Sequence, residues 1–317
     1  MFTLRGKSFY LGELLCGLKI LDPNGGWFKH NPRSGWEIET PSIEHHNKIY
    51  LQDDLTYRDN KVLELEKYID HYKDDIGKII FYTWHKGLKK SYPTLNIKWY
   101  PFFLQHHLND ALRHKDELTE AFDFESKTTK FLCLNRNIRK HRDIVYGKLK
   151  DNENCIISYK QRGVASPLEN DWSMSDYRDW NTHNREYLTN TKNLIVTSRL
   201  YNKCCFSLVT ETRTTLPFDF VTEKTTQCFI ALHPALYVSN RDHVQMLRDW
   251  GFDLFDDIFD HSYDKVAEEK ERIDMLLITN KDVLTNGFHL TEDIKNRLIA
   301  NREHYFNNVG KILIGEI

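Results

Sequence analysis

The chain has 317 residues, a length that predicts two ordinary domains or one large one. Hydrophobic residues make up 40% and charged residues 28%, which is enough apolar material for a core and excludes a disordered chain. The formal net charge is -2, so the total gives no support to non-specific binding of nucleic-acid backbones, which needs a basic excess.

The sequence predicts a cytoplasmic protein without a membrane span. It contains no apolar run of transmembrane length, and its first residues lack the apolar region and cleavage site of a signal peptide. None of the six cysteines forms a C-x-x-C pair, and most lie within apolar runs. We therefore expect reduced core cysteines rather than disulfide bonds or zinc ligands.

Residues 1–125 contain the elements of a first domain. Short apolar runs predict four strands, at Trp36–Glu39, Lys48–Leu51, Lys78–Trp84 and Ile97–Leu104. Apolar residues at helical spacing predict a helix at Asn60–Lys73. Pro101 places the fourth strand at a sheet edge or at a strand end. A charged segment with helical character, Lys115–Phe122, closes this domain.

Residues 126–290 have the regular alternation of a second domain. Four short apolar runs predict strands of a buried parallel sheet, at Lys130–Asn135, Cys155–Tyr159, Phe206–Val209 and Pro234–Ser239. Helical patterns lie between and after them, at Arg136–Lys150, Arg241–Trp250 and Val266–Leu284. A last helix, Thr291–Val309, is capped by Thr291 and belongs to a C-terminal segment, 291–317, that we expect to pack back on the first domain.

Alternating strands and helices form βαβ units and a mostly parallel sheet. Two such blocks, each too small to be the whole chain, predict an α/β protein with two Rossmann-like domains that face each other across a cleft. In sheets of this kind ligands bind beyond the carboxyl ends of the strands. The polar residues that follow the predicted strands are therefore the candidates for a binding site.

The stretch Phe206–Lys224 combines a buried strand, a polar loop with Glu211 and a helix start. Thr222 is the expected cap of this helix, Glu223 can accept hydrogen bonds from ribose hydroxyls, and Lys224 can pair with a phosphate. The free N–H groups at a helix start also favour anions. An ordinary helix start, in which a base follows an acid, is the alternative interpretation of these residues.

A second polar cluster lies where the strand Lys130–Asn135 ends and a helix begins. Its three arginines, Arg136, Arg139 and Arg142, can hold a diphosphate through forked hydrogen bonds. A solvated basic face of the helix explains the cluster equally well.

An acidic segment follows the helix that ends at Gly251. Asp256 and Asp257 suggest a metal site, but adjacent side chains of an extended chain point to opposite sides and chelate poorly. We therefore predict no metal site, and instead an acidic turn with Phe252 and Phe255 packed inside.

These clusters, in this order, resemble a family of bacterial and phage proteins similar to the α1,3-fucosyltransferases and their GT-B glycosyltransferase relatives. The matching segments, within roughly residues 130 to 265, are Phe131–Arg142, Phe206–Thr212, Phe220–Lys224, Leu247–Asp257 and Asp260–Asp264. The fucosyltransferases carry a T-E-K signature whose glutamate and lysine hold the ribose and phosphates, while an upstream arginine holds the diphosphate. The resemblance gives these roles to Glu223, Lys224 and either Arg136 or Arg139. After Lys224 the chain departs from the family, because the usual aromatic-containing helix start is missing.

The resemblance implies a GT-B fold and glycosyl transfer from a UDP- or GDP-linked sugar to a hydroxyl group, without a metal ion or other cofactor. Arginine, lysine and a helix dipole stabilise the leaving diphosphate in such a site, and a general base from the other domain deprotonates the acceptor. The base candidates of the first domain are Asp53, Asp54, His85, His106, His107 and Asp110. We prefer His85, which follows a predicted strand, together with Asp53; an ordinary surface position is the alternative for each.

Two acceptors stay open, a glycan and a hydroxymethylated base of phage DNA, and the second places the protein in the cytoplasm of a host. For DNA, Lys86–Lys90 and Arg136–Arg142 would contact phosphates, and Trp84 and Trp99 would stack on a flipped base. A different class of function is a non-catalytic module that binds a nucleotide-sugar or carbohydrate with the same fold. The sequence leaves the donor, the anomeric outcome and the oligomeric state open.

Overall fold

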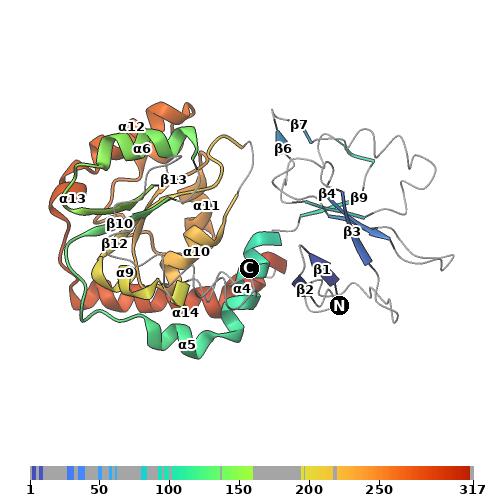
Figure 1. The fold of residues 1–317 in the computed structure, drawn as a ribbon, viewed down its shortest axis with the longest axis horizontal. Coiled ribbons are helices and arrows are strands. Elements are labelled where there is room, and N and C mark those ends of the chain that lie inside the picture. The colour runs from blue at the N-terminus through green and yellow to red at the C-terminus, as the bar shows by residue number, and fades with distance from the viewer. Residues whose placement is uncertain are drawn as a thin grey trace. The chain divides into compact units, whose positions relative to one another are not determined.

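The structure is a computed structural model of the chain. Before residue 102 it describes the short strands and residues 92–94, and after that residues 102–135, 138–159, 194–195, 197–216 and 220–314. The chain divides into two compact units, Met1–Gln105 with Leu216–Asp219, and His106–Thr215 with Phe220–Ile317. Figure 1 shows the helices and strands of each.

The first unit contains a five-stranded sheet in the order β3-β4-β5-β8-β9. Its strands are β3 (Trp27–Asn31), β4 (Gly35–Glu39), β5 (Ile49–Leu51), β8 (Ile80–Thr83) and β9 (Asn96–Trp99). The pairs β3–β4 and β4–β5 are antiparallel, whereas β5–β8 and β8–β9 are parallel. The sheet is therefore mixed, where the sequence predicted a mostly parallel one. Two separate antiparallel pairs join β1 (Phe2–Leu4) to β2 (Lys7–Phe9) and β6 (Tyr57–Arg58) to β7 (Lys61–Val62).

Two predictions in this part of the chain are wrong in detail. The predicted strand Ile97–Leu104 ends at Trp99, and helix α4 (Phe102–Arg113) begins directly after Pro101. Proline favours the start of a helix because an N–H group has no partner there. The predicted helix Asn60–Lys73 contains strand β7, and its other residues lie outside the described part of the chain.

The second unit is built on a four-stranded parallel sheet in the order β11-β10-β12-β13. Its strands are β10 (Phe131–Leu134), β11 (Cys155–Ser158), β12 (Phe206–Thr210) and β13 (Ala235–Val238), which confirm four predicted strands. Every residue of β12 and β13 is buried, as expected for strands that are covered on both faces. The predicted α/β class is thus confirmed for this unit.

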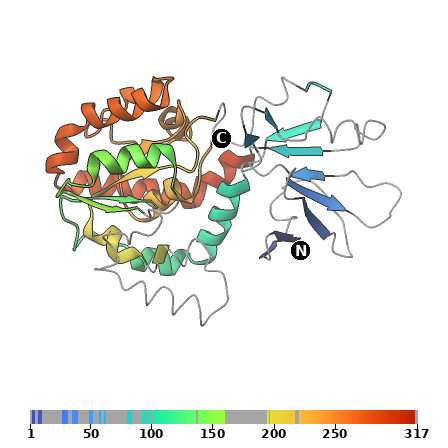
Figure 2. The same ribbon diagram turned by 45° about the horizontal axis from the view of Figure 1, so that its top comes forward.

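Helices cover both faces of this sheet. The helices that follow α4 in this unit are α5 (Lys115–Ala121), α6 (Lys140–Leu149), α9 (Ser198–Lys203), α10 (Glu223–Ile230), α11 (His243–Asp249), α12 (Glu269–Thr279), α13 (Lys281–Asn286) and α14 (Glu292–Ile314), with a 3-10 turn η4 (Ser262–Lys265). Helices α6 and α12 lie together on one face, while α9, α10 and α14 lie on the other (Figures 1 and 2). Among the described residues, no helix is both long and apolar enough to cross a membrane.

Local signals at helix ends are confirmed. The Thr222 side chain caps α10 by accepting a hydrogen bond from the Lys224 N–H group, and the Thr291 hydroxyl accepts from the Ile294 N–H group at 3.3 Å. Gly251 follows α11 with a φ of 87°, a backbone conformation that glycine adopts without strain. Helix α14 packs against α10 of the same unit. The predicted domain boundaries after residues 125 and 290 stay a prediction.

The sequence predicts one helix at Val266–Leu284, but the structure has two, α12 and α13. The helix is interrupted at Asn280, whose side-chain amide donates to the Asp260 carbonyl at 2.8 Å. The side-chain oxygen of Asn280 accepts from the Asp260 N–H group at 2.9 Å. A contact with a loop 20 residues earlier therefore accompanies the break, and helical periodicity alone does not reveal such a contact.

The described cysteines belong to the core of the second unit. Cys133, Cys204, Cys205 and Cys228 are buried, Cys155 is half-buried, and all five are free thiols. Burial raises the pKa of the Cys133 and Cys228 thiols to about 12, so both are protonated at neutral pH. Cys16 lies outside the described residues.

Candidate functional site

The order of the strands defines one edge of the second unit as the candidate site. Strand β10 pairs with β11 on one side and with β12 on the other, so the chain changes direction across the sheet between β10 and β12. Ligands of parallel α/β sheets bind at such a switch point, outside the carboxyl ends of the strands. The two polar clusters predicted from the sequence follow β10 and β12, and this edge brings them together.

Glu211, directly after β12, is a buried carboxylate that fixes the start of α10. It is 0% exposed. Its Oε1 accepts from the Thr222 N–H group at 3.1 Å and from the Thr225 hydroxyl at 2.7 Å. Its Oε2 accepts from the Thr222 hydroxyl at 2.5 Å and from the Thr212 N–H group at 3.1 Å. The sequence predicted Glu211 as a binding residue, but we assign it a structural role. It belongs to the buried side chains that hold the loop after β12 and the start of α10 in place, which we call the frame of the site.

Arg142, on α6, also holds the chain in place where β12 ends. It is 2% exposed, and its Nη2 donates to the carbonyls of Thr210 at 3.0 Å and Glu211 at 3.3 Å. Burial and the nearby charge of Arg139 lower the pKa of Arg142, while Glu211 raises it. The guanidinium thus lies among backbone carbonyls next to a buried carboxylate, which also makes it part of the frame.

His141 joins α6 to the loop after β12 as a neutral ring. Its Nε2 lies 2.9 Å from the Glu211 carbonyl, and because a carbonyl only accepts, Nε2 carries the proton. Its Nδ1 lies 3.4 Å from the Thr214 hydroxyl and 3.8 Å from Glu269 Oε1. Burial, with the charge of Arg142, lowers the pKa of His141 to about 4.

Arg272, on α12, holds the far end of this loop. It is 4% exposed, and its Nη2 donates to the Thr214 carbonyl at 2.6 Å. Its other nitrogens donate to the carbonyls of Ser239 at 3.1 Å and Val266 at 2.6 Å. Sequence reasoning did not single out Arg272 or Glu269, since both lie on a helix more than fifty residues after the loop.

Glu223 and Lys224 form the partly exposed part of the site, in the first turn of α10. Their side chains are 27% and 24% exposed and pair with each other. Lys224 Nζ also donates to the hydroxyls of Thr212 at 3.3 Å and Thr222 at 3.4 Å. Burial alone raises the pKa of the Glu223 carboxyl, but Lys224 and His107, at 3.6 Å, bring it below its usual range. Glu223 is therefore an ionised hydrogen-bond acceptor at neutral pH.

Two further arginines complete the edge, Arg139 after β10 and Arg213 after β12. Both are half-buried. Within the described part of the chain, the Nε atom of each is buried without a hydrogen-bond partner. Burial lowers the pKa of Arg139, and the positive charge of Arg213 lowers it further, so the two guanidinium groups are close enough to repel each other. Arg213 was not predicted, although its place between Glu211 and the T-E-K segment is a usable signal.

The other predicted site residues lie outside the described part of the chain. This holds for Arg136, for the preferred bases His85 and Asp53, and, among the side chains assigned to DNA contacts, for those of Trp84, Lys86–Lys90 and Trp99. Two of the base candidates are described, His107 and Asp110, and both are buried on α4. His107 contacts Glu223, so we assign it to the support of that carboxylate.

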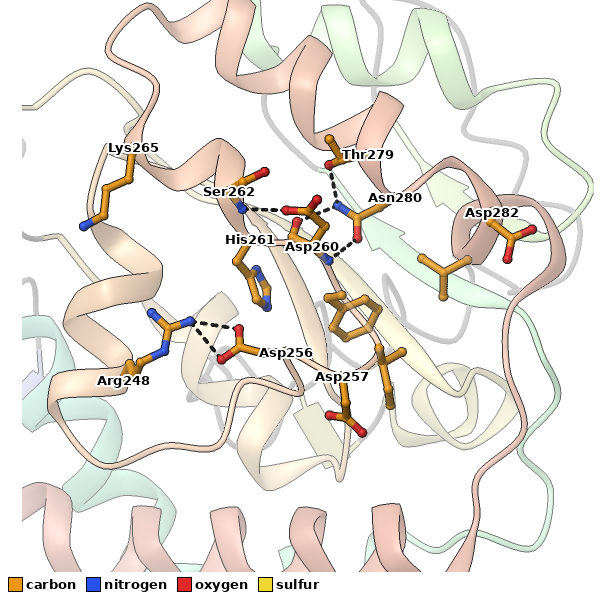
Figure 3. Close-up of a pocket in the computed structure, with 13 residues that line it drawn as sticks. Arg248, Asp256, Asp257, Asp260, His261, Ser262, Lys265, Thr279, Asn280 and Asp282 are labelled. Carbon is orange, nitrogen blue, oxygen red and sulfur yellow. Dashed lines mark hydrogen bonds and ion pairs between the residues drawn. The ribbon is translucent and has the colours of Figure 1, made fainter.

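The predicted acidic turn borders an open hollow of about 620 Å³ beside α11, η4 and α12 (Figure 3). Phe252 and Phe255 are buried beneath it, as predicted. Asp256 accepts two hydrogen bonds from Arg248, at 2.8 and 3.1 Å. Asp257 faces away from this pair in Figure 3 and accepts from Arg297 at 2.7 Å. Arg248 and Lys265, the two cations that line the hollow, thus each pair with an aspartate.

Comparisons of the chain with known protein families, curated proteins and solved structures give no match.

Proposed function

We propose that the chain transfers a sugar from a nucleotide-linked donor to a hydroxyl acceptor. The observation that carries the proposal is the grouping of Glu223, Lys224 and Arg139 at the switch point of a parallel sheet. This grouping joins the T-E-K segment to the arginine cluster, two of the segments that carry the resemblance to fucosyltransferases. The proposal includes the GT-B type of fold, in which two Rossmann-like domains face each other across a cleft.

The described residues provide the functions that the donor half of such a reaction needs. The ionised Glu223 carboxylate accepts hydrogen bonds from ribose hydroxyls. Lys224 and Arg139 supply the positive charge that faces the diphosphate. During transfer the bond from the anomeric carbon to the diphosphate oxygen breaks, and its electrons stay on that oxygen, where the cations stabilise the charge.

The acceptor half of the reaction rests on residues outside the described part of the chain. The acceptor oxygen forms the new bond to the anomeric carbon, and its proton passes to a general base. His85 and Asp53 stay the proposed bases. The proposed acceptors are a glycan and a hydroxymethylated base of phage DNA, and the proposed location is the cytoplasm.

The test is release of nucleoside diphosphate from UDP- and GDP-linked sugars, with and without acceptors. We expect turnover by the wild type and a loss of about 100-fold or more in kcat/KM for Glu223→Gln and Lys224→Ala. Lys311→Ala is the matched control, because Lys311 is an exposed lysine near the end of α14. Thermal melting shows whether each variant is folded.

The outcomes separate the alternatives. If the protein binds donors tightly but turns over none of them, it is a non-catalytic binding module rather than an enzyme. Turnover with glycans but not with hydroxymethylated DNA would exclude the DNA acceptor, and the reverse result would exclude glycans. If the protein neither binds nor turns over any of these donors, the proposal is overturned.

A further inference from the structure

We infer that His107 is a positioning residue of this site, which holds the Glu223 carboxylate in place for the ribose hydroxyls once Lys224 pairs with a phosphate of the ligand. The inference rests on the proposed function, which it deepens by adding a residue that acts on the ligand through Glu223. His107 lies on α4, outside the segments that carry the resemblance to fucosyltransferases.

The first argument is that the Glu223 carboxylate is held from two helices, one oxygen by each. Its Oε1 pairs with Lys224 of the same helix, α10, and its Oε2 lies 3.6 Å from Nε2 of His107 on α4. Within the described part of the chain, this carboxylate has no other ion pair or hydrogen bond. The Glu223 side chain is 27% exposed and can still accept from a ligand, whereas His107 is buried and acts through Glu223.

The second argument concerns the ammonium group of Lys224, which has three N–H donors and is already surrounded by three oxygens. These oxygens belong to the Thr212 hydroxyl at 3.3 Å, the Thr222 hydroxyl at 3.4 Å and the Glu223 carboxylate. A phosphate that pairs with Lys224 must therefore replace at least one of these contacts. Because Glu223 carries the negative charge among the three, the phosphate competes with it directly for the charge of Lys224.

The third argument is that His107 stays at the carboxylate after this exchange. It approaches Oε2, the oxygen that Lys224 does not hold, and it belongs to a different helix. A carboxylate without a partner would rotate, and ordering it again for each ligand would weaken binding. His107 therefore matters most in the ligand-bound state, where Lys224 faces the phosphate and Glu223 faces the ribose.

The test is titration calorimetry of the full chain with UDP, GDP and the dideoxyribose analogue of each, which lacks the ribose hydroxyls. We expect His107→Leu to weaken the binding of UDP or GDP, whichever the wild type binds, by about 10-fold. The dideoxyribose analogue should bind the wild type and His107→Leu within about twofold, since it offers Glu223 no hydroxyl. His107→Gln should keep most of the affinity, because its amide N–H group takes the place of the Nε2 donor.

Two comparisons isolate the contact with Glu223. His114→Leu is the matched control, because His114 also pairs with a glutamate, Glu117 at 3.0 Å, and its loss should leave every affinity unchanged. In a Glu223→Gln background, His107→Leu should weaken binding no further, since the charged group that His107 holds has been removed. Melting curves show whether each variant is folded. If His107→Leu does not fold, His107→Asn takes its place, since its shorter side chain does not reach Oε2.

Equal losses for a nucleoside diphosphate and its dideoxyribose analogue in His107→Leu would overturn the inference, because they would show a general effect on the fold. Unchanged affinity in this variant would also overturn it, as would a wild type that binds neither UDP nor GDP. Release of nucleoside diphosphate from nucleotide-sugars by the wild type decides the proposed function separately. If the loss depends on the ribose hydroxyls but no donor is turned over, the inference stands and the proposed function fails.

Discussion

Two polar regions of the second unit differ in how their charges are used. In the hollow beside α11 and η4, Arg248 pairs with Asp256 (Figure 3), and Lys265 pairs with Asp242. At the switch point, the buried Glu211 carboxylate accepts hydrogen bonds from Thr222 and Thr225 at the start of α10. Arg139 has no acidic partner among the described residues. Both cations that line the hollow therefore have an acidic partner, whereas Arg139 at the switch point has none among the described residues. The two regions differ in whether their arginine and lysine side chains have acidic partners.

The largest expected effect comes from breaking the frame at the switch point. Glu211→Ala removes the acceptor of four hydrogen bonds and takes away one of the two carboxylates that stabilise the charge of the buried Arg142, the other being Glu223. We expect the free energy of unfolding, measured in urea, to fall by about 3–5 kcal/mol. Glu271→Ala, an exposed position on α12, should change it by less than about 0.5 kcal/mol. A loss below about 1 kcal/mol for Glu211→Ala would contradict the role of this carboxylate.

The second effect is the pH dependence of the same frame. The pKa of His141 is about 4 in the folded chain and 6.5 in the reference state, so the unfolded chain binds more protons between these values. Stability should therefore fall as the pH drops from about 6.5 to about 4, by roughly 3 kcal/mol from this residue. The groups that face the ring are Arg139, Arg142, Arg213, Glu269, Thr214 and the Glu211 carbonyl.

Comparison with His141→Gln isolates this contribution, because His233 and His261, whose pKa values are also lowered, stay in both proteins. Urea unfolding at pH 7 and pH 4 should show a smaller pH-dependent loss for the variant. Parallel losses in the two proteins would mean that His141 is not held neutral by its surroundings.

The third effect tests the paired charges around the acidic turn. Arg297 donates to Asp253 and Asp257 and lies over the Phe255 ring, 4.6 Å from its centre. Because these carboxylates are partly exposed, we expect Arg297→Ala to lower the free energy of unfolding by only about 1–2 kcal/mol. Lys311→Ala on the same helix should be neutral. An unchanged stability of Arg297→Ala would show that these pairs do not hold α14.

The smallest effect compares one arginine from each region. Arg139→Gln removes a repelled charge, so stability should stay within about 0.5 kcal/mol or rise slightly. Arg248→Gln removes the pair with Asp256 and should lower stability by about 0.5–1 kcal/mol. Thermal unfolding at low ionic strength measures both. A clear loss for Arg139→Gln would reveal a structural role and weaken the contrast between the two regions.

The sequence by itself determined the features that depend on neighbouring residues. Four apolar runs define the strands of the second unit, and Thr222 and Gly251 mark helix ends, because burial on both faces and capping are local requirements. The same reasoning located the two polar clusters at strand ends. The prediction from sequence failed at Asn280, where the predicted helix is broken. The Asn280 side chain forms hydrogen bonds with the backbone of Asp260 there, a contact that local sequence does not show.

Only the tertiary structure decided the strand order and the partners of each charged side chain. The strand order places the ends of β10 and β12 side by side. The hydrogen-bond partners distinguish Arg142, which donates to a backbone carbonyl, from Arg139 and Arg213, whose Nε atoms have no partner among the described residues. Composition cannot make this distinction, because these arginines lie in similar polar segments. Their roles are set by contacts with residues such as Arg272, which lies 58 residues from the carbonyl that it holds.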